Sequence, residues 1–129
     1  INAIKKIIFL SFSFVCIFTL FGLGPAQASV IQNDKLLERI SNDYSNKFCN
    51  SIAFGLSKES AISFSNKENN LIFKNKKGFD NLDKGLMADK ISISVVERCG
   101  YLVELKGEEG INKFKNEYLE FANSILSGE

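Results

Sequence analysis

Histidine and tryptophan are absent from the 129-residue chain, and its only proline is Pro25. Without imidazole side chains, the chain lacks the usual general acid–base catalyst, every Ser-His-Asp or Cys-His triad, and the commonest ligand of zinc and copper. We therefore predict a protein that is not an enzyme, with no metal site and no cofactor. The lack of proline after position 25 suits helices joined by turns.

Motifs that bind phosphate or carry redox chemistry are also missing. No Gly-x-Gly-x-x-Gly or Walker-type loop occurs. Residues 107–110 begin and end with glycine, but Glu108 and Glu109 between them would repel a phosphate and suit the first turn of a helix. No Cys-x-x-Cys pair is present, so a redox-active dithiol is not predicted.

The N-terminal stretch has the three parts of a secretory signal peptide in the usual order. Two lysines and the apolar run 7–21 precede the small-residue triplet Ala26-Gln27-Ala28. We expect residues 1–28 to be cleaved off after Ala28, leaving a domain of residues 29–129 with no stable membrane anchor. The alternative is an uncleaved anchor, because the apolar stretch reaches the lower limit of a membrane-spanning helix.

Charge and cysteine content narrow the functional classes further. Removing the two leader lysines from 16 basic residues leaves 14 against 15 acidic residues, a net charge of −1. Without an excess of positive charge, the domain is not expected to bind nucleic acid. Cys16 leaves with the leader, and Cys49 and Cys99 remain as an even pair in an exported protein. The sequence therefore predicts one disulfide between Cys49 and Cys99.

The longest amphipathic helix is expected at residues 34–55, where apolar residues recur at every fourth position. We expect this helix to be the centre of an all-α bundle of about four helices. A second helix, residues 58–73, would be capped by Ser57. Its inward side chains are predicted to be Ala61, Phe64, Leu71 and Ile72.

Two interpretations compete for the third element. Asp80 can cap a helix that ends at Gly100, with Asp83 as the reciprocal capping acid. Ile91, Ile93 and Val95 alternate with serines, however, which is the spacing of a strand. We expect residues 91–96 to form part of a helix rather than a strand, because no turn signal precedes them.

The last helix has the clearest pattern. Its apolar residues step by three and four and form one seam. They are Ile111, Phe114, Tyr118, Phe121 and Ile125. Acidic residues at positions 108 and 109 would complement the helix dipole at its start, and residues 101–105 are expected to be a short extended connection.

The linker between the second and third helices is the candidate partner-binding surface. It combines Phe73 and Phe79 with three lysines, Lys74, Lys76 and Lys77. Exposed aromatic side chains supply binding energy, and charged neighbours steer the encounter. The alternative is that both phenylalanines fold back to close the core.

Two other basic features could contact a ligand. Arg98 could bind a carboxylate bidentately, or it could make an intramolecular pair at the end of a helix. Lys67 joins the linker lysines in a group that could contact anionic headgroups or an acidic partner. A merely solvated loop is the alternative for these lysines.

Three short phrases resemble those of small uncharacterised exported proteins of cyanobacteria. They are Phe48-Cys49-Asn50, Phe54-Gly55-Leu56-Ser57 and Arg98-Cys99-Gly100-Tyr101. The resemblance covers roughly residues 35–118. It implies a periplasmic or thylakoid-lumenal location, and it implies no reaction, cofactor or site.

Together these observations favour an exported, non-catalytic accessory domain that binds a protein partner in its compartment. The alternative is a domain that binds a small apolar ligand between its helices, which would require phenylalanine side chains to line a void. An enzyme is the least favoured of the three classes.

Overall fold

The computed structural model describes residues 25–128, and no strand occurs among them. The four α-helices of residues 25–128 are α2 (Pro25–Ala53), α3 (Lys58–Phe73), α4 (Lys84–Cys99) and α5 (Gly107–Ser127). Two short 3-10 helices, η1 (Phe79–Asn81) and η2 (Gly100–Val103), precede α4 and α5. The predicted all-α bundle is confirmed. Most of the expected signal peptide lies outside the described residues, so its presence and cleavage stay predictions.

Helix α2 begins earlier than the predicted start at Asp34. Its first residue is Pro25, whose ring suits the first turn of a helix because the missing N–H has no partner there. The chain divides after Gln32 into two units, and the packing described below is that of the unit that begins at Asn33.

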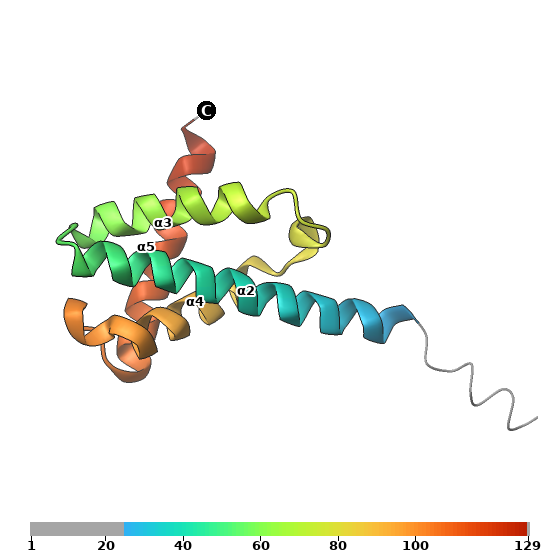
Figure 1. Ribbon diagram of the computed structural model, residues 1–129, viewed down its shortest axis with the longest axis horizontal. Helices are drawn as coiled ribbons and strands as arrows, with labels where there is room; N and C mark the ends of the chain where they lie inside the picture. The colour runs from blue at the N-terminus through green and yellow to red at the C-terminus, as the bar shows by residue number, and fades with distance from the viewer. Residues whose placement is uncertain (1–24, 129) are drawn as a thin grey trace, which may run out of the picture. The chain divides into compact units, whose positions relative to one another are not determined.

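Within this unit, α2 and α3 run antiparallel, and α4 and α5 complete the bundle (Figure 1). Helix α5 packs against both α4 and α3. Lys58 of α3 donates to Glu117 of α5 over 2.7 Å, and Lys115 of α5 pairs with Asp89 of α4 at the same distance.

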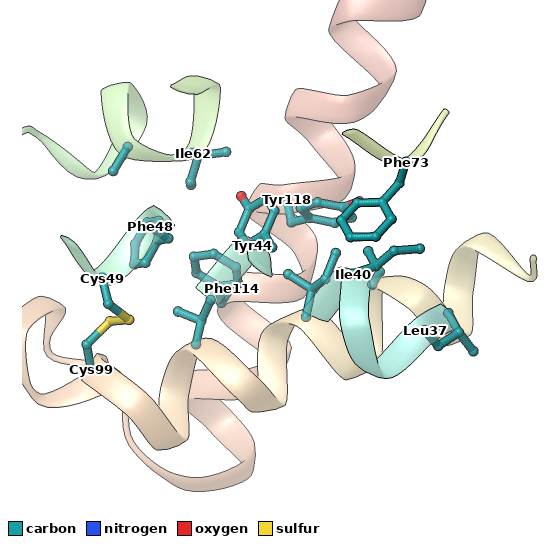
Figure 2. Packing of buried hydrophobic residues seen from close by; sticks show 14 of the residues in the cluster. Leu37, Ile40, Tyr44, Phe48, Cys49, Ile62, Phe73, Cys99, Phe114 and Tyr118 are labelled. Carbon is teal, nitrogen blue, oxygen red and sulfur yellow. A yellow bond between two sulfur atoms is a disulfide. The ribbon is translucent and has the colours of Figure 1, made fainter. Parts of the chain in front are cut away.

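The core is built around α2, as its four-residue apolar period predicts. Its buried apolar residues are Leu36, Leu37, Ile40, Tyr44, Phe48 and Cys49. Tyr44 and Phe48 meet α5 edge to face: their ring centroids lie 6.4 and 5.0 Å from that of Phe114. Figure 2 shows this aromatic group between the disulfide and Leu37, so α2 and α5 share one continuous core.

Helix α3 has the predicted bounds and the predicted Ser57 cap, but its inward face differs. The predicted inward residues Phe64, Leu71 and Ile72 are exposed. The buried residues are Ala61, Ile62, Ser65, Asn69 and Phe73. Small side chains let two helices approach closely, and a buried polar one is tolerated where it finds partners.

Asn69 finds both of its partners on α2. Its side-chain amide donates to the Ile40 carbonyl over 3.1 Å and to an Asp43 carboxylate oxygen over 2.9 Å. These bonds satisfy the buried amide, and they explain why a polar residue rather than Phe64 or Leu71 faces α2.

Helix α4 includes residues 91–96, so the helical interpretation of the contested segment is confirmed. Its N-cap is Asp83 instead of Asp80, because the Leu86 amide donates to the Asp83 side chain over 2.7 Å. Asp80 lies in η1, a single turn that closes where the Leu82 amide donates to the Phe79 carbonyl.

The connection between α4 and α5 is compact, and the predicted extended segment 101–105 is wrong. It forms η2, which closes where the Leu105 amide donates to the Gly100 carbonyl over 2.8 Å. The acidic pair Glu108 and Glu109 lies in the first turn of α5 as predicted. The α5 seam is buried at its centre, but Ile125 is exposed because the helix continues beyond α3 (Figure 1).

Candidate functional site

The predicted disulfide between Cys49 and Cys99 is present. It joins α2, close to its C-terminal end, to the last residue of α4, and the two Cα atoms lie 5.7 Å apart. Both cysteines are buried in the core cluster. The bond therefore anchors the turns that follow α2 and α4 at one end of the bundle, where Figure 1 shows them together.

Large apolar side chains are exposed on these two turns. We call them the disulfide-end patch: Phe54 and Leu56 after α2, and Tyr101 and Leu102 in η2. Phe54 is 87% exposed and Tyr101 73%. Scattered exposed apolar residues are normal, but two largely exposed aromatic rings on neighbouring turns make this end of the domain the candidate contact surface.

The turn that carries Phe54 is closed by backbone hydrogen bonds. The Gly55 amide donates to the Ile52 carbonyl over 2.9 Å, and the Leu56 amide donates to the Ser51 carbonyl over 3.0 Å. Gly55 has φ +94°, a left-handed conformation that side chains disfavour and that commonly ends helices. Phe54 is thus held on a short, ordered turn.

The turn that carries Tyr101 depends on a close backbone approach. A Cβ atom on Gly100 would lie 2.4 Å from the Leu105 carbonyl oxygen, so only glycine fits. Glu104 closes η2 in a left-handed conformation, with φ 59°. Tyr101 and Leu102 are therefore presented by a closed turn that begins directly after the disulfide.

Sequence reasoning missed this patch, although a signal was available. Phe54 lies five positions after Cys49 and is followed by Gly55, which ends a helix. Tyr101 lies two positions after Cys99 and is preceded by Gly100, a second helix-ending glycine. If the two cysteines are bonded, both glycine turns must lie at the same end of the bundle. The apolar residues next to these glycines lie beyond the buried parts of the helices, so they are exposed.

The residues of the predicted partner-binding linker do not form one exposed surface, because its phenylalanines pack toward the core. Phe73 is only 3% exposed and packs in the core, with the Arg39 guanidinium 5.8 Å from its ring centroid. Phe79 is partly buried against the same cluster. Phe73 is therefore not an exposed anchor, and the alternative, in which these rings close the core, describes both. The reason is register: Phe73 continues the buried series of Ala61, Ser65 and Asn69.

The lysines of that linker, Lys74, Lys76 and Lys77, are exposed. Binding of a partner by these lysines stays a prediction. Arg98 is exposed too, and its guanidinium donates to the Asn46 side chain on α2. The intramolecular interpretation of Arg98 therefore describes its contact, with an amide in place of a carboxylate.

Among the described residues, two buried tyrosines have clearly shifted pKa values. Burial raises the pKa of Tyr118 to about 12. Burial, and then the neighbouring Tyr118, raise the pKa of Tyr44 well above its ordinary value of 10. Both phenols therefore stay protonated near neutral pH, and their rings are part of the core cluster.

Among the described residues, no group of three or more cysteine or acidic side chains is placed to hold a metal ion. None of the helices in residues 25–128 is long and apolar enough to cross a membrane.

Comparisons with protein-family models, with curated proteins and with solved structures find no match to this chain.

Proposed function

We propose that this protein is an exported, non-catalytic accessory domain that docks onto a protein partner through the disulfide-end patch. The observation that carries the proposal is the pair of exposed rings, Phe54 and Tyr101, on closed turns at the disulfide end. Aromatic side chains of this kind dominate the energy of protein interfaces.

Rigidity favours the patch as a docking surface. Binding costs free energy when loops and side chains must be ordered, and less when they are already held in place. The Gly55 and Gly100 turns are closed by backbone hydrogen bonds, and the Cys49–Cys99 bond joins the helices that carry them. The rings can therefore be buried by a partner with little loss of chain entropy.

Affinity purification from the export compartment tests this docking. The double substitution Phe54→Ser with Tyr101→Ser removes both rings, and Leu86→Ser with Ile93→Ser removes two exposed apolar residues of α4 as a matched control. Because two central aromatic residues each contribute about 2 kcal/mol or more, recovery of the partner should fall by at least about tenfold with the first variant only. Equal recovery with both variants contradicts the proposal, provided that their melting temperatures agree.

Export is the second part of the proposal, and the order of charged, apolar and small residues in 1–28 supports it. A disulfide also suits an oxidising compartment such as the periplasm or the thylakoid lumen. We expect the intact mass of protein recovered from its host to match a chain that begins at Ser29. A mass that retains residues 1–28 would contradict cleavage.

A further inference from the structure

From Ser60 onward, the exposed face of α3 and the loop after it carry no acidic side chain, whereas the first turn of the helix holds the exposed Glu59. Between Ser60 and Lys77, every charged residue among the exposed positions is a lysine. The exposed residues are Ser60, Ser63, Phe64, Lys67, Asn70, Leu71, Ile72, Lys74, Asn75, Lys76 and Lys77. The acidic residue within this segment, Glu68, is half-buried.

Four of these residues share one stripe of the helix. Phe64, Lys67, Leu71 and Lys74 follow one another at steps of three, four and three, which places them on one side of a 3.6-residue period. The residues that face α2, such as Ala61 and Asn69, are buried. The outward stripe therefore alternates apolar and basic side chains; we call it the α3 stripe.

Charge is distributed unevenly along the chain around this stripe. Residues 58–79 contain five lysines and two glutamates, a net charge of +3. Residues 80–129 contain six basic and ten acidic residues, a net charge of −4. The neutral average of the domain thus hides a basic region next to an acidic one, and a basic region attracts anionic surfaces.

The lysines of this region are available for an external anion. The ion pairs of the described residues are Lys47–Asp43, Lys58–Glu117 and Lys115–Asp89, and none involves Lys67 or Lys74. Long lysine side chains can also lay their methylene groups along apolar neighbours while the ammonium reaches outward.

We propose that the α3 stripe binds reversibly to an anionic lipid surface. Phe64 and Leu71 would enter the headgroup region, and Lys67 and Lys74 would contact lipid phosphates, as in helices that lie in the plane of a membrane interface. A second copy of the chain would bring lysines against lysines, which like-charge repulsion disfavours. This inference goes beyond the proposed function, because it concerns a different face.

A local fluorescence probe tests the inference, because the chain contains no tryptophan. Phe64→Trp places one indole on the stripe, and Leu86→Trp places one on α4 as a control. The native side chains are 45% and 43% exposed, so the two positions match. We expect phosphatidylcholine vesicles that contain phosphatidylglycerol to shift the emission of the first variant to shorter wavelength, and high salt to reverse the shift.

The result that overturns the inference is equally local. No emission shift for Phe64→Trp, the same shift with pure phosphatidylcholine, or an equal shift for Leu86→Trp would exclude specific binding by the stripe. Because each probe reports only its own surroundings, adsorption through the N-terminal segment would not mimic the expected result. A salt-sensitive shift that polyglutamate produces as well as vesicles do would indicate an acidic protein partner instead, and would also overturn the lipid proposal.

Charge variants measure the electrostatic part. In the Phe64→Trp background, Lys67→Gln with Lys74→Gln should raise the lipid concentration at half-binding by about 25-fold, because each lysine near an anionic surface contributes roughly fivefold. The matched control, Lys84→Gln with Lys90→Gln on α4, should leave it unchanged. Equal effects of the two pairs would show attraction by net charge alone and would refute the assignment to α3.

Discussion

Removing the Cys49–Cys99 bond should strongly destabilise the domain, mainly through its unfolded state. The bond closes a loop that spans 50 positions. In the chain-entropy argument, opening such a loop increases the entropy of the unfolded chain and costs the folded state about 4 kcal/mol. The total stability of a domain of this size is about 5–15 kcal/mol, so the loss is a large fraction of it. The melting temperature should fall by about 15–30 °C.

The double substitution Cys49→Ala with Cys99→Ala, followed by circular dichroism during heating and in urea, measures this loss. Both cysteines are buried, so alanine also removes some packing. Reducing the native protein breaks the bond but keeps both cysteine side chains. The reduced protein is therefore the control that isolates the effect of loop closure. The urea m-value should rise in both, because an uncrosslinked unfolded chain exposes more surface.

Two results would refute this reasoning. One is a double-alanine variant that melts within a few degrees of the native protein. The other is peptide mapping that finds Cys49 and Cys99 both alkylated without reductant, since a native disulfide leaves neither thiol free. A large loss of stability with an unchanged m-value would locate the effect in packing rather than in the unfolded chain.

Three further predictions concern buried polar groups. Asn69→Ala should destabilise by about 2 kcal/mol in urea unfolding, because it removes two hydrogen bonds from the buried amide to α2, one of them to the Asp43 carboxylate, whereas its exposed neighbour Asn70→Ala should change little; equal effects would contradict the contacts. Because burial raises the pKa of Tyr118 to about 12, above the unfolded value of 10, its stabilising effect is complete below about pH 10 and is lost as the pH rises through 12. Melting temperatures should fall over that range, and a flat profile would contradict it. The Tyr44 hydroxyl is buried without a protein hydrogen-bond partner, so Tyr44→Phe should leave the melting temperature at neutral pH unchanged or raise it.

Large apolar residues in regular steps made α2 and α5 predictable from the sequence. Five apolar residues at every fourth position define the inner face of α2, and the structure buries four of them fully, from Leu36 to Phe48. The helix starts before the predicted Asp34, since the residues ahead of it carry no signal against helix. Capping chemistry was equally informative at Ser57, where the cap needs only the local sequence.

The inner face of α3 could not be predicted, because the side chains that make it are small or polar. Hydrophobicity predicted that Phe64 and Leu71 would face inward, but the buried residues are Ser65 and Asn69. That choice depends on an acceptor contributed by Ile40, which is close only after α2 and α3 have packed. A single-sequence pattern contains no information on such a partner.

The same limit applies to the candidate site. Phe54 and Phe73 both stand at the C-terminal end of a helix, and only their positions relative to the buried face separate them. Phe73 belongs to the inward series of α3 and is buried, whereas Phe54 lies past the last buried turn of α2 and is exposed. The disulfide could be predicted because two cysteines remain in an exported domain. The patch beside it could be predicted only once the positions of the two glycine turns in the fold were known.

The docking proposal is tested most directly by photocrosslinking at the patch in the cells that produce the protein. Benzoylphenylalanine replaces Tyr101 in one variant and Ile93, on the exposed side of α4, in the control. Irradiation should yield a discrete protein adduct from the position 101 variant and none from the control. No adduct at position 101, or the same adducts from both positions, would contradict it.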